Sequence, residues 1–324
     1  MSKTSTETVR HALHGPTMGT RWSALFYAAP GLDIMPIQAA LQQAVQRVDA
    51  QMSTWNPDSD LMRLNSAPIG QWVTIPADLA RVLALGLDIG RASAGAFDIG
   101  MGDAVRAWGF GAQTAQEAAI RAALTAQRHA AHDLLELDGK RVRKQAPICL
   151  DLNGIAKGYG VDQLALTLRR FGITAALVGI DGELRALGLR PDRQGWAVAV
   201  EAPDPDQRAP HSMLVLHDAA VATSGDYRHW VQVQDRRLSH TMDPRRGAPL
   251  PHPPASVTVI APTCAQADAW ATALMVAGPD TGMALAAQHG LSALFLLRGK
   301  QHELSARACG ALFSAHPGAV TQPA

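Results

Sequence analysis

Residues 148–162 read Ile-Cys-Leu-Asp-Leu-Asn-Gly-Ile-Ala-Lys-Gly-Tyr-Gly-Val-Asp, and the expected fold is organised around this stretch. Its apolar start, 148–152, predicts a buried strand, and Asn153-Gly154 predicts a turn into a helix. We expect that helix to end at Gly172, because glycine adopts a left-handed cap without strain. A strand that delivers Asp151 to a helix start can bind a phosphorylated ligand through free backbone N–H groups. It can equally be a connector whose small residues serve packing, and the stretch alone leaves both interpretations open.

The composition indicates a globular protein rather than a disordered one. Of the 324 residues, 47% are hydrophobic and 18% are charged, which is enough apolar material for a sizeable core. The formal net charge is +1 and no run of Lys or Arg occurs, so we expect no nucleic-acid partner. The length suits one large domain or two of ordinary size.

The cysteines and the N-terminal segment bear on the compartment. Cys149, Cys264 and Cys309 stand far apart without a Cys-x-x-Cys pair, so a thiolate metal site is not expected. An odd number of cysteines favours a reducing compartment. Residues 1–20 contain no apolar signal segment and no lipobox cysteine, and no window approaches a membrane span. We therefore expect a cytoplasmic protein, or a periplasmic one if a leader has been removed.

The order of the expected elements predicts an α+β fold, with mixed, largely antiparallel sheets packed against helices. Strands outnumber helices after Gly172 and do not alternate regularly with them, which argues against a doubly wound sheet. We expect a flexible N-terminus at 1–16, a single domain of one or two lobes at 17–315, and a flexible C-terminus at 316–324. Periodicity and turn signals predict helices over 36–52, 77–93, 114–128 and 280–289, and strands over 22–27, 174–179, 183–188, 196–201, 212–217, 219–223, 229–233, 256–261 and 291–297.

Asp268 and Thr272 are a candidate pair for metal chemistry. They stand four residues apart on a helix expected to begin at a Thr263–Gln266 capping box, so their side chains share one face. Carboxylate and hydroxyl oxygens suit Mg²⁺ or Ca²⁺ rather than zinc, and Mg²⁺ completes its shell with water and substrate phosphates. In the structural alternative, the carboxylate favours the positive end of the helix and the hydroxyl packs or bonds back to it.

Two further features bear on chemistry. His240 and Asp243, in a loop that ends at Pro244, are either an acid–base pair or a satisfied structural pair. Trp55 stands among Ser, Thr, Asn and Pro residues, which favours an exposed stacking platform over a core residue. The sequence contains no serine nucleophile elbow, zinc-protease motif or kinase signature.

Eight short motifs follow one another along about residues 17–300. They are Met18-Gly19-Thr20; Met52-Ser53-Thr54-Trp55 with Ser59-x-Leu61-x-Arg63-x-Asn65; Phe97-Asp98 before Trp108-Gly109-Phe110-Gly111; Asp151-Leu152-Asn153-Gly154-Ile155-Ala156-Lys157-Gly158-Tyr159; Gly182-Glu183-Leu184-Arg185; Thr223-Ser224-Gly225-Asp226-Tyr227; His240-x-x-Asp243-Pro244-Arg245-x-Gly247; and Ala267-Asp268-Ala269-x-Ala271-Thr272-Ala273. Each motif alone is weak, but the eight in order are highly specific. With them the chain resembles the FAD:protein FMN transferases, the ApbE family of flavin transferases.

The resemblance implies an ApbE-like α+β fold and a Mg²⁺-dependent transferase. Such an enzyme splits FAD, attaches FMN through a phosphoester bond to a Thr or Ser hydroxyl of a target flavoprotein, and releases AMP. The metal ligands that it implies are Asp268, Thr272 and the carbonyls of Gly154 and Ala271, of which Ala271 requires a local irregularity in its helix. The FAD contacts that it implies are Met18, Trp55, Ala96, Phe97, Asp98, Asp151, Lys157 and Met242, with Trp55 as the adenine-stacking aromatic.

The resemblance also assigns the remaining roles and leaves alternatives. The metal is expected to hold the phosphates, and His240 or Asp243 to act as the base near the incoming hydroxyl, with Asp243 orienting His240. The chain departs from the family at Ile99-Gly100-Met101-Gly102-Asp103, where Pro-Thr-Val-Gly-Pro is usual, and at Arg246, where threonine is usual. An FAD hydrolase that yields FMN and AMP, or a non-catalytic FAD-binding protein, are the alternative functions.

Overall fold

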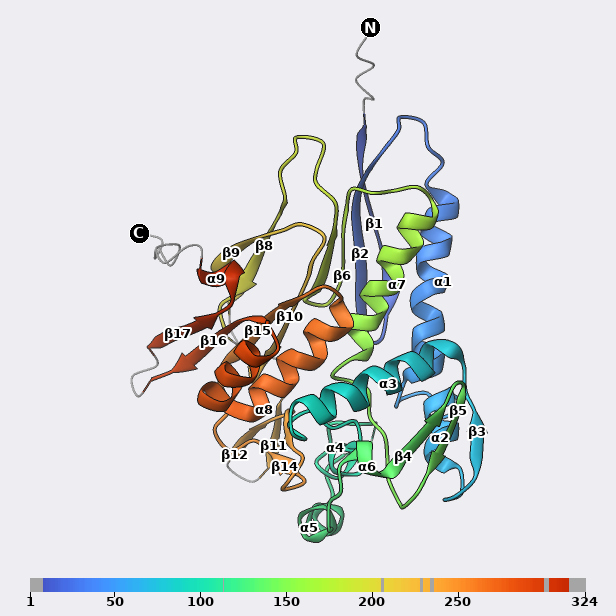
Figure 1. Ribbon diagram of the computed structural model, residues 1–324, viewed down its shortest axis with the longest axis vertical. Helices are drawn as coiled ribbons and strands as arrows, with labels where there is room; N and C mark the ends of the chain where they lie inside the picture. Colours follow the sequence, from blue (N-terminus) through green and yellow to red (C-terminus); the bar gives the residue numbers. More distant parts are fainter. Residues whose placement is uncertain are drawn as a thin grey trace, which may run out of the picture.

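The fold is built on an eight-stranded sheet (Figure 1). The computed structural model describes residues 8–112, 114–204, 207–227, 230–233, 236–299 and 303–314. Every pair of neighbouring strands is antiparallel, which confirms the α+β prediction. In spatial order the strands are β1 (Val9–Thr17), β2 (Thr20–Ala28), β6 (Ala176–Ile180), β7 (Glu183–Leu187), β10 (Ala220–Gly225), β15 (Ser256–Ala261), β16 (Ser292–Arg298) and β17 (Leu304–Cys309).

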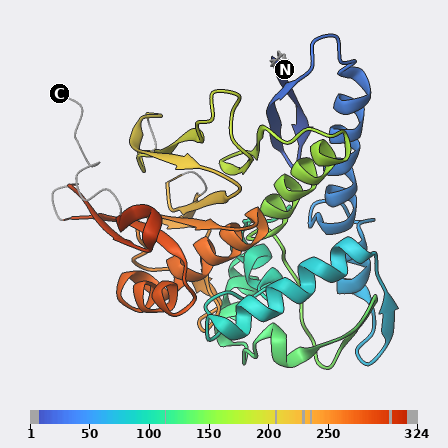
Figure 2. The same ribbon diagram turned by 45° about the horizontal axis from the view of Figure 1, so that its top comes forward.

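Three long helices cover one face of this sheet: α1 (Met35–Met52), α7 (Ala156–Arg170) and α8 (Cys264–Gln288). Helices α1 and α7 lie side by side, and α8 lies along β10 and β15 (Figures 1 and 2). Side chains of a strand alternate between faces, so in β16 Phe295 packs with the helices while Leu294 packs on the other side. There the hairpin of β8 (Trp196–Glu201) and β9 (Pro210–Leu216) completes a second apolar layer.

A second group of elements packs against α8 and the end of α1. Its largest hydrophobic cluster joins Leu61 and Leu83 to Phe295 of the main sheet, so both groups share one core. The group contains α2 (Asp60–Ser66), α3 (Ala77–Ala92), α4 (Gly102–Ala107), α5 (Glu117–Thr125), α6 (Ala131–Leu134) and a small sheet of β3 (Trp72–Thr74), β5 (Arg141–Lys144) and β4 (Leu135–Asp138). The remaining elements are β11 (Trp230–Val233), β12 (Arg236–Ser239), β13 (Met242–Asp243), β14 (Ala248–Pro249) and α9 (Ala311–Ser314).

The N-terminal prediction needs a correction, because residues 9–16 belong to β1 rather than to a flexible segment. Towards its end β1 alternates between exposed and buried residues, with Leu13 buried and His14 exposed, and it pairs along its whole length with β2. The polar residues therefore form the solvent side of a strand. Residues 1–7 and the expected flexible C-terminus at 316–324 lie outside the described residues.

Residues 148–152 do not form the predicted strand, although Leu150 and Leu152 are buried and the other three are partly buried. Their one β-type contact in the described chain is an isolated parallel bridge between Met101 and Cys149. Other partners satisfy the backbone: Asp151 N donates to Ile99 O at 2.8 Å, and the Asn65 side chain bonds both polar groups of Leu150. The apolar run thus indicated burial correctly, while side-chain partners replaced a sheet neighbour.

The helix boundaries are mostly as predicted. Gly172 follows α7 with φ of +75°, and the Thr263 side chain caps α8 by accepting a hydrogen bond from Gln266 N at 3.3 Å. The capping box predicted at Thr114 is wrong, because α5 begins at Glu117 without a side-chain cap. The helix predicted over 280–289 is the continuation of α8 beyond Gly278, where φ is +76°. In the described part of the chain, none of these helices has the length and apolar character needed to cross a bilayer.

Candidate active site

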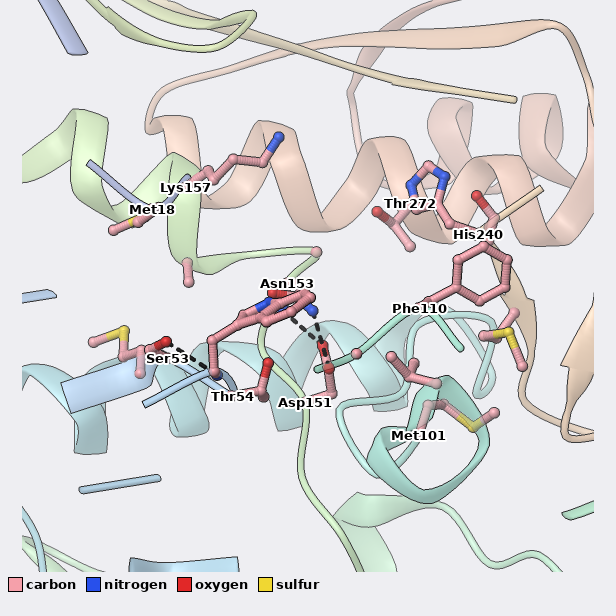
Figure 3. Close-up of a pocket in the computed structure, with 18 of the residues that line it drawn as sticks. Met18, Ser53, Thr54, Met101, Phe110, Asp151, Asn153, Lys157, His240 and Thr272 are labelled. Carbon is pink, nitrogen blue, oxygen red and sulfur yellow. Dashed lines mark hydrogen bonds between the residues drawn. The ribbon is translucent and has the colours of Figure 1, made fainter. Parts of the chain in front are cut away.

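The main cavity has a volume of about 990 Å³ and lies where both groups of elements meet (Figure 3). All eight residues expected to contact FAD line this cavity, together with His240, Gly154 and Thr272. Asp243, Asp268 and Ala271 do not line it. Figure 3 shows Lys157 and Thr272 on helices α7 and α8, with Asp151 and Asn153 below them in the view. The structure therefore gathers eleven of the fourteen candidate residues, drawn from the whole length of the chain, at one pocket.

Met18 reaches the pocket from the tight turn between β1 and β2. Thr17 pairs with Thr20, which leaves Met18 and Gly19 as the two turn residues, with φ of +45° and +70°. Two consecutive positive φ values match the twist of an antiparallel hairpin, and glycine favours them. Met18 adopts the left-handed region although it has a side chain, which is a conformation often found at functional sites.

Trp55 lies at the rim of the pocket on a loop that follows α1. The Ser53 hydroxyl accepts hydrogen bonds from Trp55 N at 3.1 Å and from Asn56 N at 3.2 Å, so it shapes this loop. Trp55 is 62% exposed, whereas the core tryptophan Trp22 is fully buried. The prediction that Trp55 is exposed is confirmed, and a ring in this position can stack on a planar ligand.

Asp98 and Asp151 provide two carboxylates on one wall. Asp98 Oδ1 accepts from Gly100 N at 2.7 Å and from Ala131 N at 3.2 Å, and burial raises the pKa of Asp98. The Asp151 oxygens accept from N and Nδ2 of Asn153 at 2.8 and 3.0 Å. Burial raises the pKa of Asp151 to about 6, although the Asn153 N–H bond opposes the rise. Both carboxylates are thus held in fixed orientations.

Lys157 projects from the first turn of α7 beside several acids. Its Nζ donates to Glu183 Oε1 at 2.8 Å and lies 3.4 Å from Asp181 Oδ2. Burial lowers the pKa of Lys157, but the charges of Glu183, Asp268 and Asp181 outweigh that effect and raise the pKa overall. The side chain is therefore a permanent cation between the pocket and the buried acids.

Asp268 and Thr272 lie one turn apart in α8, as the sequence predicts. Asp268 is 5% exposed, and its Oδ2 accepts from Gly158 N of α7 at 3.0 Å. Burial and then the charge of Glu183 raise the pKa of Asp268 to about 7, although Lys157 opposes them. A cation bound beside a buried carboxyl of this kind would stabilise its ionised form.

Thr272 brings the hydroxyl of this pair into the pocket next to Gly154. A Cβ atom placed on Gly154 would lie 3.1 Å from Thr272 Oγ1, so a larger residue at 154 would crowd the hydroxyl. Thr272 Oγ1 also lies 3.2 Å from Ser224 Oγ. Ala271 is fully buried, and the irregularity within α8 is at Gly278 rather than beside Ala271. The donors at this position are hard oxygens, which suit Mg²⁺ and not a thiolate-binding metal.

His240 and Asp243 differ in their surroundings. The His240 ring lines the pocket and meets Phe110 edge-on, with ring centroids 6.4 Å apart. Asp243 shapes the turn that follows, because its Oδ1 accepts from Arg245 N at 3.0 Å and its carbonyl accepts from Gly247 N at 2.9 Å. Of the two candidate bases, His240 is therefore the one that lines the pocket.

Several residues that surround the site have no role predicted from the sequence. Glu183 is a buried acid, and the partly buried Asp162 holds the start of α8 by accepting from Cys264 N at 2.9 Å and Ala265 N at 3.0 Å. Arg185 pairs with Asp162. Acidic and basic residues at the start of an otherwise apolar strand, as in Glu183–Leu187, were the available signal. Asn153, Asp181 and Phe110 also line the pocket.

A cavity of this size beside a fixed cation and buried carboxyls is typical of an enzyme that binds a large, charged small molecule. The family model described as "ApbE family" matches residues 18–295. The chain belongs to the ApbE family.

Curated relatives and solved structures agree with this membership. The chain is 35% identical over 295 residues to the FAD:protein FMN transferase of Vibrio cholerae, a match that covers 88% of this chain and 87% of that protein. It is 33% identical over 304 residues to the protein of the same name from Klebsiella pneumoniae, covering 92% and 86%. The structure of the flavin transferase ApbE from Vibrio cholerae is similar with a TM-score of 0.83 at 32% identity, covering 95% of this chain and 99% of that one. The apo flavinyl transferase ApbE of Pseudomonas stutzeri has a TM-score of 0.83 at 34% identity, covering 95% and 96%.

Proposed function

We propose that this chain transfers FMN from FAD to a Thr or Ser hydroxyl of an acceptor flavoprotein, in the presence of Mg²⁺ and with release of AMP. One observation carries the proposal: all eight candidate FAD residues line the pocket that also contains His240 and Thr272, and Thr272 lies one helical turn from Asp268. The volume of about 990 Å³ is at the upper end for ligand pockets, which suits a ligand as large as a dinucleotide.

Asp268, Thr272 and the Gly154 carbonyl would hold Mg²⁺. Gly158 N donates a hydrogen bond to Asp268 Oδ2, whereas no described residue forms a hydrogen bond with Oδ1. One carboxylate oxygen is therefore available for a cation. The Thr272 hydroxyl and Gly154 both line the pocket, and a Cβ atom on Gly154 would lie 3.1 Å from that hydroxyl. When bound, Mg²⁺ would neutralise charge on the phosphates, and water and phosphate oxygens would complete its shell. The Ala271 carbonyl is the weakest candidate, because it lies in a regular part of α8.

The side chains of the pocket divide the remaining work. Trp55 would stack on the adenine, and the Lys157 cation would balance the negative charge of the FAD phosphates. His240 would accept the proton of the incoming hydroxyl while the hydroxyl oxygen bonds to the FMN phosphorus. The P–O bond of the diphosphate breaks in the same reaction, and AMP leaves with the electron pair. Asp243 would act indirectly, through the shape of the turn that follows His240.

The proposal predicts covalent labelling of an acceptor flavoprotein that carries a threonine in its flavinylation motif. We expect a fluorescent flavin band on a denaturing gel when the protein, FAD, Mg²⁺ and the acceptor are mixed, with AMP released in equal amount. Replacement of the acceptor threonine by valine should abolish the band. Release of FMN and AMP without any acceptor would instead indicate a hydrolase, and intact FAD after hours with Mg²⁺ would indicate a binding protein.

His240→Ala is expected to slow transfer by about a hundredfold, because it removes the proposed general base. FAD affinity should change much less, since His240 is one of many pocket residues. Stopped-flow or gel-based rates across pH 5.5–8.5 would check the role, with Asp243→Asn measured alongside. With Mg²⁺ saturating at every pH, loss of the acidic limb of the pH profile in His240→Ala supports the assignment. A profile unchanged by this substitution, or one altered only by Asp243→Asn, contradicts it.

Mg²⁺ affinity should fall as the solution becomes more acidic than pH 7. The pKa of Asp268 is raised to about 7 in the metal-free protein, and a carboxylate must lose its proton to bind a cation. Well below that pKa, each pH unit should weaken Mg²⁺ binding about tenfold, whereas above pH 8 the affinity should be constant. Calorimetric titration at pH 5.5, 6.5, 7.5 and 8.5 would measure this. A constant affinity from pH 5.5 to 8.5 would exclude Asp268 as a ligand.

A further inference from the structure

Asn65, the sixth residue of α2, joins this helix to the pocket segment 148–152. Its Nδ2 donates to Leu150 O at 2.9 Å and its Oδ1 accepts from Leu150 N at 2.7 Å, across a separation of 85 residues. The side-chain amide therefore makes the two hydrogen bonds that a neighbouring strand would otherwise make. Leu150 is fully buried, so loss of these bonds would leave two buried backbone groups without partners.

Asn65 is itself held in place from the opposite side. Lys144 Nζ of β5 donates to the backbone carbonyl of Asn65 at 2.7 Å, and Lys144 is only 4% exposed. This bond fixes the backbone of Asn65, from which the side-chain amide reaches Leu150. Because its backbone and its side chain are both bonded, Asn65 is a rigid link and not an adaptable surface contact.

The other end of α2 is joined to the Trp55 loop. Ser59, which is fully buried, caps α2 by accepting from Met62 N at 3.1 Å, and its hydroxyl donates to Ser53 O at 2.7 Å. The Ser53 hydroxyl in turn fixes Trp55 by accepting a hydrogen bond from Trp55 N. The seven residues of α2 therefore connect the wall that carries Trp55 to the wall that carries Asp151.

The bonds at Leu150 also determine where two carboxylates lie. Asp151 follows Leu150 directly, and Asp151 N donates to Ile99 O at 2.8 Å in the loop that carries Asp98. We propose that Asn65 is a positioning residue, which sets the distance between the Trp55 wall and the Asp98–Asp151 wall and thereby the affinity for FAD. The inference rests on the proposed function, because it takes FAD as the ligand of this pocket.

The test compares Asn65→Leu with Leu61→Ala. Leucine has the branching of asparagine, although it is larger, and it makes neither bond to Leu150, whereas Leu61 is a fully buried residue of the same helix whose side chain makes no hydrogen bond. FAD binding is measured by flavin fluorescence without Mg²⁺ or acceptor, so that no turnover occurs, and thermal unfolding is measured for both variants. We expect the FAD dissociation constant to rise about tenfold in Asn65→Leu and less than twofold in Leu61→Ala, although both lower the melting temperature.

Two further variants keep the result decisive. Asn65→Asp keeps the size and the acceptor oxygen of the side chain but replaces the donor. This variant serves if Asn65→Leu does not fold, and we expect it to weaken FAD binding at least tenfold. Asp151→Asn tests the wall itself. If unaltered protein binds no FAD, the proposed function fails. If Asp151→Asn weakens binding while Asn65→Leu or Asn65→Asp does not, or if Leu61→Ala weakens it equally, the positioning role of Asn65 is overturned.

Discussion

Asp268→Asn is expected to slow FMN transfer by about 10³-fold at saturating FAD and Mg²⁺, while the protein remains folded. The substitution removes the only carboxylate proposed for the metal, and an amide oxygen binds Mg²⁺ much more weakly than a carboxylate does. Transfer should therefore need far more Mg²⁺, and higher Mg²⁺ should recover only part of the rate. The measurement is the initial rate of covalent flavin labelling from 0.1 to 50 mM Mg²⁺, a range set by about 10⁻³ M affinities of sparse oxygen sites.

The stability of this variant separates a loss of chemistry from a loss of structure. Burial and the charge of Glu183 raise the pKa of Asp268 to about 7. A carboxyl with a raised pKa stabilises the fold below its unfolded pKa, and this stabilisation is lost as the pH rises through about 7. Without Mg²⁺ at pH 8, Asp268→Asn should thus unfold no more easily than the unaltered chain.

Asp280→Asn is the matched control, since it makes the same chemical change on the same helix. Its carboxylate is 89% exposed, pairs with Arg307 and does not line the pocket. We expect an unchanged transfer rate and Mg²⁺ dependence, because exposed ion pairs contribute little. Equal rates for Asp268→Asn and Asp280→Asn would remove Asp268 from the proposed mechanism.

Gly158→Ala is expected to destabilise the protein by about 3 kcal/mol and to reduce transfer as well. A Cβ atom on Gly158 would lie 2.4 Å from the Cys264 carbonyl oxygen and 2.8 Å from Asp268 Cβ. The first obstacle is backbone of a neighbouring helix, which cannot rotate away as a side chain could. The new methyl group would therefore separate α7 from α8 and lengthen the bond from Gly158 N to Asp268.

Urea unfolding of Gly158→Ala and Gly182→Ala would measure this effect. Gly182 lies in the turn between β6 and β7, where a Cβ atom would meet nothing within 4 Å, so its replacement should change the free energy of unfolding by less than about 0.5 kcal/mol. If Gly158→Ala is as stable as Gly182→Ala, the two helices can separate freely. In that case the close approach of α7 does not hold Asp268.

The sequence predicted the regular elements well because their signals are local. The spacing of apolar residues in α1, the glycine after α7 and the threonine cap of α8 each act within one or two helical turns. The pairing of Asp268 with Thr272 follows from the same helical repeat. The candidate FAD contacts were not predicted from local patterns. Only the resemblance carried by the eight motifs in order assigned Met18 and Met242 to the same pocket, which both residues line.

The predictions that were wrong or left open concern patterns that do not by themselves determine the structure. Residues 148–152 have the composition of a strand, and only the fold shows that Asn65 takes the place of its neighbour. Thr114 and Glu117 have the spacing of a capping box, but α5 begins after Gln116 in an extended conformation. His240 and Asp243 stand three residues apart, a spacing that did not distinguish a residue facing the pocket from one shaping a turn.

The position of β2 has a consequence for how the protein is made. Strand β2 can pair with β1 as soon as both are made, but β6 follows only after about 150 further residues. The pocket is lined by Met18, which precedes β2, and by Thr272, which lies far along the chain. During synthesis the pocket can close only when α8 has left the ribosome, because contacts between distant residues form late. FAD can therefore bind only the finished fold, and bound FAD would act on the whole chain as a stabilising ligand that disfavours every partly folded form.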